Sequence, residues 1–125
     1  MEQTGRLNWY IVDGYRPPRF EGGAKDYEGH ECIMILNCND SDAHVTIDVF
    51  FMDREPVTGI RYTAPARRIS AFRSNDKSVF GDLELGENLQ YSLRITSDIG
   101  VVVQYGRMDV NQPNLAYIAT LGYAE

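Results

Sequence analysis

The stretch HVTIDVFFM, residues 44–52, decides the fold class, because its side chains alternate in character with a period of two. One face of a strand built from it would carry the apolar side chains of Val45, Ile47, Val49 and Phe51. No window of a dozen residues anywhere in the chain keeps apolar side chains at helical spacing. The sequence therefore predicts an all-β protein in which this face of residues 44–52 lines the core.

The opposite face of the same strand begins polar at His44 and ends on Phe50 and Met52. Apolar side chains on an outer face are typical of a surface that another molecule covers. We interpret Phe50 and Met52 as interface residues against a second subunit. Partial cover by the chain's own loops is the alternative.

Further strands are expected at 8–12, 32–36, 60–63, 68–73, 89–96, 101–107 and 115–121, each bounded by Gly, Pro, Asn or Asp. Residues 32–36 are apolar on both faces, as in a central strand that is packed on two sides. Turn residues at 37–42 and at 97–100 predict two hairpins. About eight short strands predict one domain over residues 1–125, a β-sandwich of the jelly-roll type.

Length, charge and cysteine content exclude several classes of protein. The chain has 125 residues, which is one domain's worth, and its net charge of −6 disfavours general binding to nucleic acid or to anionic membranes. It contains no apolar run of the roughly 20 residues that cross a bilayer, so membrane insertion is not expected and a cytoplasmic location is the default. Cys32 and Cys38 are too far apart along one strand to form a disulfide.

Motifs for catalysis, metals and cofactors are missing from the sequence. It has no nucleophile elbow, no P-loop and no dinucleotide-binding glycine pattern after a strand. With only His30 and His44, a histidine triad or a three-histidine metal site has too few ligands. We therefore expect no bound metal and no cofactor, and we expect function to reside in the two long loops at 14–29 and 75–87.

Arginines form the most suggestive polar set. Arg67, Arg68 and Arg73 lie on one short segment, and guanidinium groups suit bidentate binding of a carboxylate or phosphate. Ion pairs with the chain's own acidic residues are the structural alternative. Arg107 follows Val101, Val103 and Tyr105 on the face of a strand that points inward. A buried arginine needs a charged or polar partner, and Glu31 and Asp109 are the candidates.

Aromatic residues offer a further candidate surface. Trp9 and Tyr15 precede a Pro17-Pro18 pair and could form a platform on which a sugar ring or another flat ligand stacks. A single tryptophan in a small domain also serves as a core residue, and both interpretations are open at this stage.

Ordered blocks along nearly the whole chain form a recognisable pattern. The most specific blocks are Asp42-Ala43-His44-Val45 and Pro65-Ala66-Arg67-Arg68, and others include Gly14-Tyr15 with Pro17-Pro18, His30-Glu31, Arg73 with Asn75-Asp76, and Val101-Val102-Val103-Gln104 with Arg107 and Asp109. In these blocks the chain resembles the sensory rhodopsin transducer family. It departs from the family pattern at Ala71-Phe72 and at Tyr105-Gly106, where the family carries histidine. The loss of these candidate ligands weakens the case for a metal site further.

The resemblance implies a soluble cytoplasmic jelly-roll sandwich that assembles as a homotetramer, without an assigned reaction. Carried over residue by residue, the family's polar motif positions imply the following ligand- or partner-binding residues: Trp9, His30, Glu31, Arg67, Arg68, Arg73, Asn75, Asp76, Gln104, Arg107 and Asp109. His44 belongs to the same pattern.

Three hypotheses for function follow. The leading hypothesis is a non-enzymatic ligand-binding or signalling module that holds a small polar or anionic molecule, such as a sugar derivative. The alternative is a transducer that binds a microbial sensory rhodopsin or another protein. The third is a sugar-active enzyme, for which Glu31 and Asp109 would be the paired carboxylates.

Overall fold

The computed structural model describes residues 4–17, 29–86, 88–110 and 116–125. Within these residues the all-β prediction is confirmed, and strands account for every regular element except one short helix. In chain order the elements are β1 (Arg6–Tyr15), β2 (His30–Asn37), β3 (Ala43–Phe51), β4 (Val57–Ala64), β5 (Arg68–Arg73), α1 (Lys77–Phe80), β6 (Gln90–Asp109), β7 (Ala116–Leu121) and β8 (Tyr123–Ala124).

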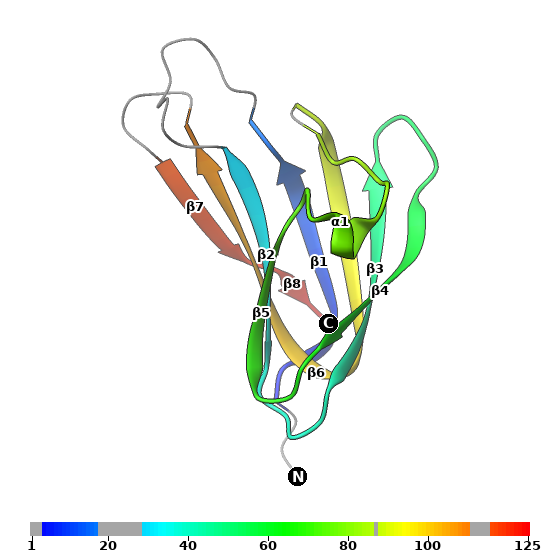
Figure 1. Ribbon diagram of the computed structural model, residues 1–125, viewed down its shortest axis with the longest axis vertical. Helices are drawn as coiled ribbons and strands as arrows, with labels where there is room; N and C mark the ends of the chain where they lie inside the picture. Colours follow the sequence, from blue (N-terminus) through cyan, green and yellow to red (C-terminus); the bar gives the residue numbers. More distant parts are fainter. Residues whose placement is uncertain (1–3, 18–28, 87, 111–115) are drawn as a thin grey trace.

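The strands form two antiparallel layers that share β6 (Figure 1). The first half of β6 pairs with β1 and β3, and this layer has the order β4-β3-β6-β1-β8. Its second half pairs with β2 and β7, and β5 extends that layer beyond β2. The two layers pack face to face, as the ring contact between Tyr62 of β4 and Phe72 of β5 shows, with centroids 4.8 Å apart.

The hairpin predicted at 97–100 is wrong, because β6 runs through this segment as one strand of 20 residues. The residues expected to form the turn bind other segments: Asp98 accepts a hydrogen bond from the backbone N–H of His44 on β3 at 2.8 Å, and the Gly100 carbonyl accepts one from Asn39 in the β2–β3 turn at 2.7 Å. A Cβ at Gly100 would collide with the carbonyl of Thr4. Glycine here permits the close approach that lets β6 pass from one layer to the other.

The hairpin predicted at 37–42 is also wrong, because this turn joins the two layers. β2 pairs with β5 and β6, whereas β3 pairs with β4 and β6. The fully buried side chain of Asn37 holds the connection, donating to the carbonyls of Ser41 and Ala64 at 3.0 Å each and accepting the N–H of Asn39. The turn chemistry was visible in the sequence, but the pairing partner was not.

The core confirms the alternation in residues 44–52. Val45, Ile47 and Val49 are at most 2% exposed, and they pack in one cluster with Ile33 and Ile35 from the other layer. The two-sided packing expected of residues 32–36 is only half present, because Leu36 on the outer face is 41% exposed. Strand β2 is therefore central in its sheet yet covered on one side within this chain.

The segment that follows β5 was expected to be a loop, and it contains α1, a single helical turn. Asp76 is its N-cap, and its carboxylate accepts the N–H of Ser78 at 2.9 Å. Phe80 anchors the turn in the core against Phe72, with ring centroids 6.0 Å apart. A helix this short escapes detection by periodicity, because one turn shows no repeat.

We predict that Gly14→Ala destabilises the fold by about 1–3 kcal/mol, the usual cost of overpacking a tight interior. Gly14 is buried on β1, where a Cβ would overlap the ring of Tyr91 on the neighbouring β6. Urea unfolding followed by circular dichroism measures the change. Gly86→Ala is the matched control, because a Cβ there meets nothing within 4 Å. Equal unfolding midpoints for the two variants would contradict this packing.

Candidate functional site at the loop end of the sandwich

One end of the sandwich gathers most of the polar residues singled out in the sequence. At this loop end β1 finishes, β2 begins, the α1 segment crosses and β6 finishes (Figure 1). Register places Glu31 opposite Arg107 and His30 opposite Met108, and Arg73 lies opposite Cys32. The strand ladders thus bring together side chains that are far apart in the sequence.

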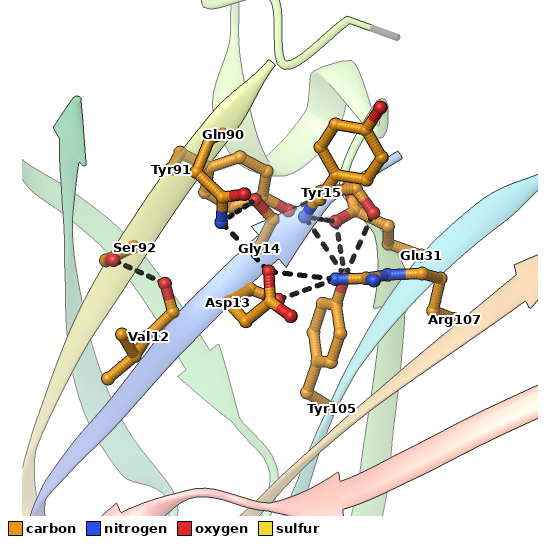
Figure 2. Close-up of polar contacts among 10 residues, drawn as sticks. All are labelled: Val12, Asp13, Gly14, Tyr15, Glu31, Gln90, Tyr91, Ser92, Tyr105 and Arg107. Atoms are coloured by element: carbon orange, nitrogen blue, oxygen red, sulfur yellow. Dashed lines mark hydrogen bonds and ion pairs between the residues drawn. The ribbon is translucent and has the colours of Figure 1, made fainter. Parts of the chain in front are cut away.

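Glu31 is the centre of this end, and it is completely buried. Its Oε2 accepts the hydroxyl of Tyr91 at 2.7 Å, and its Oε1 accepts the hydroxyl of Tyr105 at 2.5 Å and the backbone N–H of Tyr15 at 2.6 Å (Figure 2). A buried carboxylate is tolerated when donors replace the lost water. Both of its oxygens are occupied by protein donors, so Glu31 supports the site from inside.

Arg107 joins the same network from the second half of β6. Its Nε donates to the Tyr105 hydroxyl at 3.2 Å, and a terminal nitrogen donates to the Asp13 carbonyl at 2.8 Å and lies 3.3 Å from the Asp13 carboxylate. The partner is therefore Asp13, and the expected pairing with Glu31 is indirect, through the Tyr105 hydroxyl. We call these residues, Asp13, Tyr15, Glu31, Tyr91, Tyr105 and Arg107, the Glu31 network.

The surroundings of Tyr91 and Tyr105 keep their hydroxyl groups protonated, so that they act as hydrogen-bond donors. Burial, together with the adjacent Glu31 carboxylate, raises the pKa of Tyr91 and of Tyr105 above the ordinary tyrosine value. At the exposed rim, a hydrogen bond from Gln90 and then the charge of Arg107 lower the pKa of Asp13. Both tyrosines therefore stay protonated near neutral pH and donate their hydroxyl hydrogens to Glu31.

The other predicted residues at the loop end have different surroundings. Asn75 is exposed, Asp76 caps α1, and His30, Arg73 and Asp109 lie on or next to the strands that carry the network. Because Glu31 is buried and fully hydrogen-bonded, Glu31 and Asp109 do not present two carboxylates to a sugar substrate as expected for the enzyme hypothesis. Among the described residues, no group of three His, Cys, Asp or Glu side chains is placed to hold a metal ion.

Several predicted site residues lie elsewhere. Arg67 and Arg68 are exposed at the opposite end, where Arg67 pairs with Asp40 at 2.7 Å. Gln104 is exposed on the outer face of its sheet, opposite Met34 and Leu121. The stacking platform proposed around Trp9 is wrong, because this indole is only 4% exposed and its N–H donates to the carbonyls of Arg6 and Val101.

Phe50 and Met52, the predicted interface residues, lie at one edge of the β3 outer face. Phe50 is 36% exposed and Met52 is 85% exposed. The guanidinium of Arg94 covers part of Phe50 at 5.6 Å from the ring centroid and is fixed by Asp48 at 2.8 Å. Part of this apolar surface is therefore covered by the chain's own arginine.

Sequence reasoning missed Tyr91 and Asp13, neither of which was singled out as a site residue. The inward position of Tyr105 was visible in the alternation of residues 101–107. A buried phenol needs a hydrogen-bond partner, and that requirement was the available signal. It could not name Glu31, because the two residues meet only across the β2 and β6 ladders.

Fold and network together define a small all-β sandwich with a buried polar network at one end. Residues 4–124 match the family described as Anabaena sensory rhodopsin transducer, and the chain belongs to this family. The resemblance noted in the sequence is confirmed. A search among curated proteins found no significant match.

Two solved structures extend the comparison. A structure titled Crystal Structure of Thermotoga maritima 1070 superposes with a TM-score of 0.80 at 28% identity, covering 97% of this chain and 96% of that one. The Anabaena sensory rhodopsin transducer superposes with a TM-score of 0.69 at 36% identity, covering 84% of this chain and 97% of that one. Both cover most of the chain, so the likeness is not confined to one hairpin.

We predict that Tyr91→Phe lowers the free energy of unfolding by about 1–3 kcal/mol, because it removes one of the three donors that the described residues supply to the buried Glu31. Tyr123→Phe is the matched control, since this tyrosine is 65% exposed; its change should stay within about 0.5 kcal/mol. Urea titration of both variants measures the difference. A Tyr91→Phe protein as stable as the control would show that Glu31 does not depend on this hydroxyl.

Proposed function

We propose that this chain is a non-enzymatic cytoplasmic signalling protein that acts as a transducer by binding a protein partner. Family membership over residues 4–124 is the observation that carries the proposal. The Glu31 network supports it, because its buried, fully hydrogen-bonded centre is built for a fixed shape and not for proton transfer. No helix among the described residues is long and apolar enough to cross a membrane.

The partner we propose is a microbial sensory rhodopsin, the protein that the family description names. Charge supports this choice. The chain carries a net charge of −6, and the cytoplasmic loops of membrane proteins are rich in Lys and Arg. Attraction between the acidic chain and the basic loops of the rhodopsin would steer their association, while anionic lipid around the rhodopsin would repel the chain.

The test is binding to Anabaena sensory rhodopsin in lipid nanodiscs, measured by biolayer interferometry, with the Anabaena transducer as positive control. We expect saturable binding that weakens as salt is added, because opposite charges attract the two proteins, and we expect no binding to empty nanodiscs. If the Anabaena transducer binds and this chain does not, the proposed partnership with this rhodopsin is wrong.

We further propose that the chain works as a homotetramer, and the open face of the β5-β2-β6-β7 sheet supports this. Its outward side chains are largely apolar, and they are Cys32, Met34, Leu36, Ile69, Ala71, Val102, Gln104, Met108, Tyr117, Ala119 and Leu121, with His30 and Arg73 at the loop end. Ile69, Tyr117 and Leu121 are each more than 50% exposed. Patches of this kind are uncommon on monomers.

A second copy of the chain is the occupant we propose for the open face. An apolar face meets its own copy across a twofold axis without needing a complementary charge pattern. Such a contact would also cover the outer side of β2, whose sequence is apolar on both faces. Within the described residues the chain covers only the inner side of that strand.

We predict that the protein elutes with four times the mass of one chain in light scattering and that Leu36→Lys with Ile69→Lys dissociates it. Burying two ammonium groups in an apolar contact is strongly unfavourable. Val12→Lys is the control, because Val12 is 73% exposed on the other sheet. Dissociation by Met52→Lys instead would locate the interface at Phe50 and Met52. A monomeric native protein would refute assembly altogether.

Binding of a small polar or anionic molecule is a second candidate function. A cavity of about 600 Å³ at the loop end favours it, with Arg16, Asn75 and residues 81–86 in its wall. This volume lies within the range of small-molecule sites, which is roughly 300–1,000 Å³. A signalling protein could use such a ligand as its input.

A further inference from the structure

The cavity beside α1 has a firmly anchored wall. Residues 81–86 connect two core anchors, Phe80 at 5% exposure and Leu85 at 2% exposure. A Cβ at Gly81 or at Gly86 would meet no atom within 4 Å, so both glycines border open space. Arg16, which follows β1, also lines the cavity, and its carbonyl accepts the N–H of Asn88 at 2.9 Å. The cavity is therefore framed by segments that the core and the backbone hold in place.

Arg16 lines this cavity and is half-buried. Its Nε is shielded from solvent, and in the part of the chain that the structure describes no acceptor lies within hydrogen-bond distance of it. A buried N–H without a partner costs about 1–3 kcal/mol. An arginine side chain also carries a full positive charge at all physiological pH values. An anionic oxygen entering the cavity would pair with the charge of Arg16, which is one of the residues that line it.

The remaining polar groups of the cavity are exposed and have both signs. Lys77 and Asn75 offer donors, whereas Asp82 and Glu84 offer carboxylate acceptors. Exposed charges are weakened by water and salt, so the two exposed carboxylates oppose an anion less than the half-buried Arg16 attracts it. Carboxylates and an amide at the rim are suited to accepting and donating hydrogen bonds with hydroxyl groups.

We infer that this cavity binds a small polyhydroxylated oxyanion, with its anionic oxygens on Arg16 and its hydroxyl groups on the rim. The inference rests on the second candidate function and adds the site and the chemical class of the ligand. A sugar acid and a sugar phosphate share this chemistry, one through a carboxylate and the other through a phosphate.

Calorimetric titration of the full chain tests the inference with three matched probes. They are D-glucuronate, D-glucose 6-phosphate and D-glucose, which share a hexose framework and differ in the presence and type of oxyanion. We expect saturable binding of at least one of the two anions, at least about tenfold tighter than of glucose. Which anion binds more tightly distinguishes the carboxylate source from the phosphate source.

Variants locate the binding. Arg16→Gln should weaken the anion about tenfold or more, since it removes a charged hydrogen bond while the backbone contact to Asn88 remains. Lys77→Gln, an exposed change at the rim, should weaken it less and guards against misfolding of the first variant. Arg67→Gln at the opposite end removes the same charge and should leave the affinity unchanged.

The outcomes distinguish a failure of the oxyanion inference from a failure of the ligand-binding function. Glucose binding as tightly as both anions would overturn the oxyanion inference and leave ligand binding standing. No saturable heat with any of the three probes would overturn the inference, and a wider thermal-shift screen without a response would overturn the ligand function too. Anion affinity unchanged in both Arg16→Gln and Lys77→Gln would show that the anion binds elsewhere.

Discussion

Strand β6 is the constraint on which the rest of the sandwich depends. It pairs with β1 and β3 through its first half and with β2 and β7 through its second half. The two layers are therefore joined by continuous backbone hydrogen bonding. The observed register brings Glu31 to Tyr105, and a slip of β2 by one residue would turn Ile33 and Ile35 out of the core.

The Glu31 network links β1, β2 and β6 at the loop end and so holds these strands in place there. Phenol hydroxyls from both halves of β6 and a backbone N–H from β1 converge on one carboxylate. Removing a donor leaves a buried acceptor short of a partner, which is why such networks are sensitive to single substitutions. Tyr15 of the network directly precedes Arg16, so the network fixes the end of β1 from which the cavity residue Arg16 follows.

The polar motif residues lie at separate places in the structure because strand pairing decides which of them meet. Glu31 and Arg107 share the loop end because β2 and β6 are antiparallel neighbours. Arg67 and Arg68, although close to Arg73 in sequence, lie near the other end because β5 runs the length of the sheet between them. Trp9 shows the same limit, since its place in the core was one of two interpretations that the local sequence allowed.

By itself the sequence determined the all-β class, the inward face of residues 44–52 and the inward orientation of the Tyr105 side chain. Period-two alternation is a local property of a strand, so it can be read without the partner strands. Tertiary structure alone decided that residues 97–100 continue a strand, that 37–42 join two layers, and that Asp13 is the partner of Arg107. Turn propensity is local, whereas a strand's choice of neighbour depends on hydrogen bonds to residues distant in the chain. Those partners become visible only when both layers are assembled.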